Sequence, residues 1–258
     1  MRDARADDWL RRLRTRGADW KTRLNRFAVE SVPSIGSVEV PIQAPLTVFS
    51  GPNGVGKTTL LRAMWAALDA QAAAPAIAAS KKLSSGKALV ELSVEEKTQR
   101  GEVQFSSDDL ITLSSASVVV SHIDSAALTP LHQREFCQFE SVEDIVNGAG
   151  PRVLDGGALE EVSYILHRRY RSVTVYEVEL DSTVPFFEVS YGDDRYDSRT
   201  MGAGELAALY IWWAVGRAEP DSVLLVEEPE AFLSYGSQKS LANFIISMIV
   251  KKRLVCVM

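Results

Sequence analysis

Short apolar runs and segments with helical periodicity follow one another along the chain. The runs at 46–50, 222–226 and 254–258 are continuous enough to predict buried strands. Apolar positions recur with a helical period over 204–217 and 237–251. Buried strands interspersed with helices predict an α/β fold, in which helices flank the sheet.

A second set of segments alternates between apolar and polar residues, as half-buried strands do. Strands are expected at 27–32, 37–40, 88–95, 102–105, 110–113, 117–123, 172–180 and 186–191. Further helices are expected at 141–146 and 159–170 and from residue 57 onward. Because Pro75 interrupts the alanine-rich stretch 66–79, we expect a helix followed by a loop there.

The first 26 residues are rich in arginine, and Trp9, Leu13 and Trp20 lie on a rough helical stripe. We therefore predict a basic amphipathic N-terminal helix at 1–26 and one large domain at 27–258. The helix is either an arm that contacts nucleic acid or a partner, or a solvated helix packed on the domain. Charge runs usually mark exposed faces, which favours the second interpretation.

The segment 51–59 matches the phosphate-loop consensus G-x-x-x-x-G-K-[ST] at every fixed position. It follows an apolar strand and precedes a helical segment, which is the context that this motif requires. Glycines let the backbone turn its N–H groups inward as a nest for an anion, and the following helix adds its positive dipole end. We therefore expect a nucleoside triphosphate to be bound by Gly51, Pro52, Asn53, Gly54, Val55, Gly56, Lys57, Thr58 and Thr59.

Two side chains of this loop have separate expected roles. Lys57 would reach the β- and γ-phosphates, and the Thr58 hydroxyl would ligate Mg²⁺. A second motif supplies carboxylates for the same site, because the apolar strand 223–226 ends in Glu227 and Glu228. We expect Glu227 to hold Mg²⁺, usually through a water, and Glu228 to orient and polarise the attacking water.

A third motif, Met201-Gly202-Ala203-Gly204-Glu205, precedes this acidic strand. A glycine-rich loop that opens a helix is able to bind phosphate through its backbone N–H groups. The alternative is an ordinary loop at a helix start, and the position of the motif before the strand favours phosphate binding.

These three motifs, in this order, resemble those of the ABC-type ATPases. Segment 51–59 is similar to the Walker A loop, 201–205 to the signature loop and 223–228 to the Walker B strand. Glu227-Glu228-Pro229-Glu230 resembles the form found in non-transporter members. These include the ATPase domains of overcoming-lysogenisation-defect nucleases, related anti-phage ATPases, and the recombination and chromosome-maintenance ATPases. The resemblance implies a P-loop NTPase fold with a mixed sheet, flanking helices and an additional antiparallel β portion.

The resemblance also implies an activity, cofactors and partners. ATP and Mg²⁺ would be bound, and ATP would be hydrolysed with Lys57 and Glu228 as catalytic residues. In this family two heads close face to face around two ATP molecules, so a homodimer is expected. Gly202, Gly204 and Glu205 would then contact the γ-phosphate held by the other copy. A nuclease or other effector protein, and DNA, are the further partners that the resemblance suggests.

Several positions depart from the family pattern. Gly202 stands where the signature loop usually carries serine, and Glu227 replaces the commoner aspartate. The segment 233–235 reads Leu-Ser-Tyr instead of the Leu-His-Pro of the nuclease-linked group. Either Gln104 or Gln133 is expected to supply the glutamine that contacts Mg²⁺.

A switch histidine is expected just after the strand that follows Walker B. The sequence ends within that strand, at 254–258, and none of His122, His132 or His167 has the right place. We expect a C-terminal truncation, and the alternative is a natural protein whose hydrolysis is impaired or is completed by a partner. A non-hydrolysing, ATP-gated dimerisation scaffold and the nucleotide-binding subunit of an ABC transporter therefore stay open as functions.

Composition changes this picture little. The chain has 258 residues, which suffice for one large or two small domains. A net charge of −6 argues against a surface that coats nucleic acid generally, but allows a local basic patch. Cys137 and Cys256 lie far apart without metal-ligand spacing, and no apolar run reaches the ~20 residues that span a bilayer. A cytoplasmic protein with no membrane contact is expected.

Overall fold

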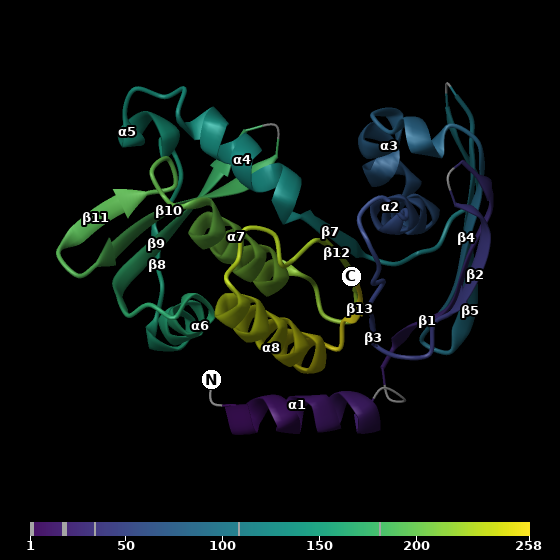
Figure 1. Cartoon of the computed structure of the whole chain (residues 1–258), viewed down its shortest axis with the longest axis horizontal. Helices are drawn as coiled ribbons and strands as arrows, with labels where there is room; N and C mark the ends of the chain where they lie inside the picture. Colours follow the sequence, from purple (N-terminus) through teal and green to yellow (C-terminus); the bar gives the residue numbers. More distant parts are fainter. Residues whose placement is uncertain (1–2, 17–19, 34, 108, 181) are drawn as a thin grey trace. The chain divides into compact units, whose positions relative to one another are not determined.

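The strands of the chain form three β-sheets with helices packed beside them (Figure 1). The structure is a computed structural model that describes residues 3–16, 20–33, 35–107, 109–180 and 182–258. The chain divides into two units. The Walker A unit comprises Trp9–Ile123, Ala218–Glu227 and Met248–Met258, and the signature unit comprises Met1–Asp8, Asp124–Arg217 and Glu228–Ser247.

The Walker A unit contains two of the sheets. The antiparallel sheet has the order β2-β1-β4-β5-β6, with β1 at Thr22–Val32, β2 at Gly36–Pro41, β4 at Gly86–Val94, β5 at Lys97–Phe105 and β6 at Leu110–Ser114. The other sheet has the order β3-β13-β12-β7, with β3 at Leu46–Thr47, β7 at Val120–Asp124, β12 at Val223–Glu227 and β13 at Val255–Val257. Strand β13 pairs in parallel with both β3 and β12. The carboxyl ends of these three strands therefore lie at one edge of the sheet, where ligands bind in such folds.

Helices of the Walker A unit pack on one face of the antiparallel sheet (Figure 1). Those on this face are α2 (Lys57–Leu68), α3 (Ala70–Ala78) and the short 3₁₀ helix η2 (Lys81–Leu83), and the unit also includes most of α1 (Asp3–Arg16) and the end of α8 (Tyr235–Lys252). Alternate residues of β4 and β5 are buried toward α2, among them Val90, Leu92 and Val103. On the helix, Leu61 and Met64 are buried as well. A half-buried sheet needs such a cover because its apolar face has no other way to leave water.

The signature unit is built on the antiparallel sheet β11-β10-β9-β8. Its strands are β8 (Arg152–Val153), β9 (Tyr170–Glu179), β10 (Thr183–Tyr191) and β11 (Asp194–Asp197). Its helices are α4 (Ser125–Phe136), α5 (Val142–Ile145), α6 (Gly156–Leu166) and α7 (Ala203–Arg217), together with most of α8 (Tyr235–Lys252). One buried cluster joins α4 and α5 to β9 and β10, and it consists of Phe136, Ile145, Val178, Val184 and Phe186.

The predicted α/β fold is confirmed, with mixed sheets, flanking helices and an additional antiparallel portion. The strand pair at 27–32 and 37–40 is present as β1 and β2, and the buried runs at 222–226 and 254–258 form β12 and β13. The helices expected at 204–217 and 237–251 are α7 and α8. Buried strands and long helices are predicted most reliably from sequence, because continuous apolar runs and helical periodicity directly reflect which residues are buried.

The expected helix at 1–26 is wrong in its extent. Helix α1 covers only Asp3–Arg16, and β1 already begins at Thr22, so the predicted boundary after residue 26 falls inside a strand. Residues 1–2 and 17–19 of that segment lie outside the described part of the chain. The competing signal was the alternation of buried Thr22 and Leu24 with exposed neighbours, which the arginine content obscured.

Three further local expectations need correction. Pro75 lies inside α3 rather than ending a helix, because Asp69 caps a new helix by accepting a hydrogen bond from the Ala72 N–H (3.0 Å). Helix α4 was not expected, although Asp124 caps it in the same way through Ala127 (3.0 Å). Strand β11 was also missed, since it is only four residues long.

A close approach between α2 and β5 gives a test of this packing. A Cβ atom added at Gly101 would overlap the carbonyl oxygen of Ala67, so no side chain fits there without moving the helix. Gly101→Ala should lower the free energy of unfolding by about 1–3 kcal/mol, as overpacked cores do. Urea unfolding followed by circular dichroism measures this change.

Gly216→Ala is the matched control. Gly216 lies in α7, and a Cβ there meets nothing within 4 Å. The substitution should be neutral or stabilise the protein, by about 0.5–1 kcal/mol, because alanine is the better helix former. If both variants unfold at the same urea concentration, the proposed contact between α2 and β5 is wrong.

Candidate nucleotide-binding site

The Walker A loop lies between β3 and α2. Gly54 and Gly56 have φ angles of +87° and +101°, a region that side chains rarely adopt. Gly56 is the N-cap of α2, and its carbonyl accepts the Leu60 N–H at 2.8 Å. Gly51, Pro52, Asn53, Gly54 and Val55 are exposed, whereas Thr59 is buried. The loop thus presents a glycine backbone and a helix N-terminus to solvent, as an anion-binding nest must.

Lys57 adds a positive charge to this nest. It is the first residue of α2, and its ammonium donates hydrogen bonds to the carbonyls of Gly51 (2.8 Å) and Pro52 (3.1 Å). The ammonium is therefore held over the loop itself. No acidic side chain lies in the first turn of α2, so nothing there offsets the positive end of the helix dipole.

Glu227 ends β12 and is almost completely buried, with 5% of its surface exposed. Its Oε1 atom accepts a hydrogen bond from Arg62 Nε at 3.2 Å and lies 2.9 Å from His122 Nε2. The imidazole of His122 stacks on Trp65, with ring centroids 4.1 Å apart and planes within 15°. Arg62 and Trp65 belong to α2, so these contacts join the helix that follows the Walker A loop to the end of the Walker B strand.

Oxygen atoms of Glu227 and Thr58 fit the predicted magnesium site. Arg62 and His122 both contact the Oε1 atom of Glu227, and among the described residues no hydrogen-bond partner is found for its Oε2 atom. The hydroxyl of Thr58, in the first turn of α2, is a second oxygen donor of the same unit. Hydroxyl and carboxylate oxygens are the hard ligands that Mg²⁺ prefers. The donor set therefore suits a Mg²⁺–triphosphate, while the individual ligand roles stay predictions.

Sequence reasoning missed Arg62 and His122. His122 is the second-last residue of the apolar strand expected at 117–123, and the sheet order places that strand beside β12. A histidine within an apolar strand could have indicated a polar partner for its side chain, but the order of strands in a sheet cannot be predicted from one sequence. Arg62 had no signal beyond its place on the predicted helix.

The predicted signature segment, Met201–Glu205, spans the end of the connection after β11 and the first turn of α7, which begins at Ala203, in the signature unit. Met201 is buried, whereas Gly202 and Ala203 are exposed. A Cβ atom at Gly204 would overlap the Phe232 carbonyl oxygen, so this glycine is required by a close backbone approach. The exposed backbone of the loop is short and glycine-rich, and this agrees with the predicted contact to phosphate without testing it.

Glu205 is placed differently from the other residues of this loop. Its buried carboxylate accepts hydrogen bonds from Tyr170 Oη (2.5 Å), Tyr196 Oη (2.7 Å) and Arg168 Nη1 (3.0 Å). Burial and the hydrogen bond to Glu205 raise the pKa of Tyr196 to about 12 and raise that of Tyr170 as well. Both phenols therefore stay protonated donors. The carboxylate is engaged inside the unit, and its predicted contact with nucleotide stays a prediction.

Glu228 begins a tight turn in the signature unit. Its φ angle is +44°, unusual for a residue with a side chain, and its carbonyl accepts the Ala231 N–H at 2.9 Å. The side chain is exposed. An accessible carboxylate held by strained backbone suits an acid that orients water, although that role is not tested.

The two candidate glutamines have other contacts. Gln133, on α4, donates from Nε2 to the carbonyls of Ser198, Arg199 and Met201. Gln104 lies on β5, opposite Ile111 of β6. Among the described residues neither glutamine bonds to Glu227, whereas His122 does, and the choice of a glutamine that contacts Mg²⁺ stays a prediction.

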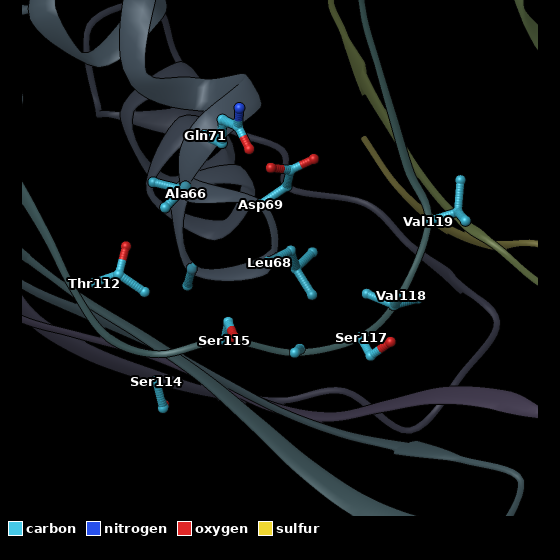
Figure 2. Close-up of a pocket in the computed structure, with 13 residues that line it drawn as sticks. Ala66, Leu68, Asp69, Gln71, Thr112, Ser114, Ser115, Ser117, Val118 and Val119 are labelled. Carbon is cyan, nitrogen blue, oxygen red and sulfur yellow. The ribbon is translucent and has the colours of Figure 1, made fainter.

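A separate cavity of about 510 Å³ lies in the Walker A unit (Figure 2). It is lined by the end of α2, the start of α3 and the segment 112–119. Figure 2 shows Asp69 and Gln71 on the helical side of the cavity and Ser115 and Ser117 on the segment opposite, and none of the predicted site residues takes part.

Among the described residues, no group of three or more histidine, cysteine, aspartate or glutamate side chains is arranged to hold a metal ion. No helix in the described ranges is long and apolar enough to cross a bilayer.

Comparisons with known proteins bear on the fold and on ATP binding. Residues 28–144 match the family model of the AAA domain. The structure is similar to the SMC head domain from Thermotoga maritima, with 10% identity, a TM-score of 0.51, and 91% of this chain and 88% of that chain covered. It also matches the recombination mediator protein RecF with ATP, of the RecFOR pathway, with 10% identity, a TM-score of 0.46, and 93% and 92% covered. No curated protein matches the chain.

The structural likeness bears on the fold, and the family match bears on ATP binding. The likeness to the SMC head shows the fold, an α/β P-loop NTPase fold with flanking helices. The AAA-domain match includes the complete Walker A loop and supports ATP binding there.

The ion cluster at Glu227 gives a prediction about stability. Arg62→Met leaves a buried carboxylate with one charged donor fewer and should cost about 1–3 kcal/mol in urea unfolding. Glu227→Gln in the same chain should recover part of this loss, because a neutral amide does not need the guanidinium.

Arg100→Met is the control for this cycle. Arg100 pairs with Glu102 at 2.6 Å on the surface, and its side chain is 53% exposed. Such pairs contribute about 0–1 kcal/mol. Equal losses for Arg62→Met and Arg100→Met would contradict the assigned importance of the Glu227 cluster.

Proposed function

We propose that this chain binds ATP with Mg²⁺ and hydrolyses it as one head of a homodimer, in the cytoplasm. One observation carries the proposal above all others. The helix that follows the Walker A loop is joined through Arg62 to Glu227 at the carboxyl end of β12. The anion-binding nest and the metal-binding carboxylate are therefore parts of one packed unit, as triphosphate chemistry requires.

Each residue of the loop has a part in holding the triphosphate. The N–H groups at Gly54 to Thr58 would surround the phosphate oxygens, since the glycine φ angles turn this backbone inward. Lys57 would exchange the carbonyls of Gly51 and Pro52 for phosphate oxygens, which are stronger acceptors. When bound, Mg²⁺ neutralises the charge that develops on the phosphates.

Glu227 would face the metal with Oε2, while Arg62 and His122 hold Oε1. A carboxylate fixed in this way loses little rotamer freedom when the metal binds, which favours affinity. Glu228 would accept a proton from the attacking water, because its side chain is exposed directly after the buried strand.

The surface beside the signature loop supports a dimer. Phe232 is 53% exposed and Tyr235 is 84% exposed, and the backbone of Phe232 lies against Gly204. Exposed aromatic side chains next to a glycine-rich loop are suited to contact with a partner protein. We propose that this surface meets the Walker A loop of a second copy, with Gly202 and Gly204 at its γ-phosphate.

The controlled effector is proposed on the resemblance of the motifs alone. Glu227-Glu228-Pro229-Glu230 resembles the form found in DNA-repair and anti-phage ATPases. We therefore propose that ATP-driven closure and opening control a DNA-directed or anti-phage effector, such as a nuclease.

Removing the Lys57 ammonium should strongly weaken nucleotide binding. Lys57→Ala should weaken the affinity for a fluorescent ATP analogue by about 100-fold, because charged hydrogen bonds to phosphate are lost. Fluorescence anisotropy with Mg²⁺ measures this affinity. Lys97→Ala, at an exposed lysine that begins β5, should leave it unchanged. Tight binding by Lys57→Ala would show that the site is assigned wrongly.

Glu228→Gln should separate binding from turnover. We expect it to bind ATP normally, to release phosphate at least about 100-fold more slowly, and to accumulate as an ATP-dependent dimer. Phosphate release, with and without DNA, and light scattering are the measurements. A wild-type protein that dimerises with ATP but never releases phosphate would instead be a non-hydrolysing scaffold.

A further inference from the structure

We infer that Gln133 is a positioning residue that fixes the backbone of the signature loop for contact with the triphosphate of a second copy. The inference rests on the proposed dimer. Gln133 was one of two glutamines expected at Mg²⁺, but its amide is turned to the strand-to-helix connection instead.

The contact is unusually dense for one side chain. Nε2 of Gln133 lies 2.9 Å from the Met201 carbonyl, 3.1 Å from that of Ser198 and 3.3 Å from that of Arg199. An amide nitrogen carries only two N–H donors, so at least one of them is shared between two carbonyls. These carbonyls belong to the residues that lead directly into Gly202.

The same connection is fixed by its own side chains. Ser198 is fully buried, and its Oγ accepts the Phe187 N–H of β10 at 2.8 Å. Arg199 forms a two-pronged ion pair with Asp197, at 3.1 and 2.8 Å. The carbonyl of Asp197 accepts the N–H groups of Thr200 and Met201, each at 3.0 Å. This turn orients three carbonyls in one direction, toward α4.

Glu205 holds the other end of the loop. Its carboxylate is bound by Tyr170, Tyr196 and Arg168, which come from β9, β11 and the residues after α6. With both ends fixed, Gly202 and Ala203 are the exposed residues between them. Their backbone conformation is thus set before any partner arrives, and less entropy is lost when the dimer forms.

The test compares variants at position 133 that differ in the hydrogen-bond donors of the side chain. Gln133→Glu replaces the donors by acceptors facing three carbonyls, and Gln133→Met removes them with little change in volume. We expect both to weaken the ATP-dependent dimer by about 10- to 100-fold in sedimentation velocity. Affinity for the fluorescent ATP analogue at the Walker A loop of the monomer should stay within twofold.

Two further variants separate positioning from a general loss of structure. Gln133→Lys keeps three rotatable donors and should restore most of the dimer affinity. Gln138→Glu makes the same charge change at an exposed residue just beyond α4 and should have no effect. If Gln133→Glu fails to fold, Gln133→Met carries the comparison.

A second readout does not need the dimer. Hydrogen exchange of peptides covering residues 199–206 should be at least about tenfold faster in Gln133→Met than in wild type. Unchanged exchange, or normal dimerisation by Gln133→Glu, would overturn the inference. A wild-type protein that binds ATP but never dimerises, with faster exchange in Gln133→Met, would refute the proposed dimer and leave the positioning of the loop standing.

Discussion

The buried carboxylate of Glu227 is the constraint on which the Walker A unit depends. A charge at this depth is stable only when cationic or polar groups surround it, and Arg62 and His122 meet that need. Because Arg62 comes from α2 and His122 from β7, neutralising the charge also fixes the helix to the sheet edge. The position of the helix after the Walker A loop is therefore set in part by the need to neutralise the buried carboxylate of Glu227.

The signature unit fixes its loop with hydrogen bonds made by Gln133 and Glu205. A loop that must meet another molecule needs exposed backbone, yet exposed backbone is ordinarily mobile. Here Gln133 and Glu205 hold residues on either side of Gly202, so that the exposed stretch is short. Neither residue would touch nucleotide through the atoms used for these bonds. Their amide and carboxylate groups act on backbone order, and the proposed contact with nucleotide is left to the loop itself.

The sequence predicted the Walker A loop, the acidic strand and the α/β fold, because each depends on local patterns of glycine, charge or burial. It did not predict the partners of Glu227, since Arg62 and His122 meet it only through strand order and helix packing. The two glutamines considered for Mg²⁺, Gln104 and Gln133, show the same limit, because residue type and rough position did not reveal the direction of the Gln133 amide. Helix α1 was overextended because charge content outweighed the alternation that begins at Thr22.

The contact between Gly204 and the carbonyl of Phe232 has a mechanical consequence. Phe232 lies four residues after Glu228, in a turn whose backbone is strained at both residues. With no side chain between them, the loop and this turn lie in direct backbone contact. Pressure from a partner on Gly202 would therefore reach the carboxylate of Glu228 through backbone alone. If Glu228 orients water as proposed, this backbone contact would make its position depend on a second copy without any relay of side chains.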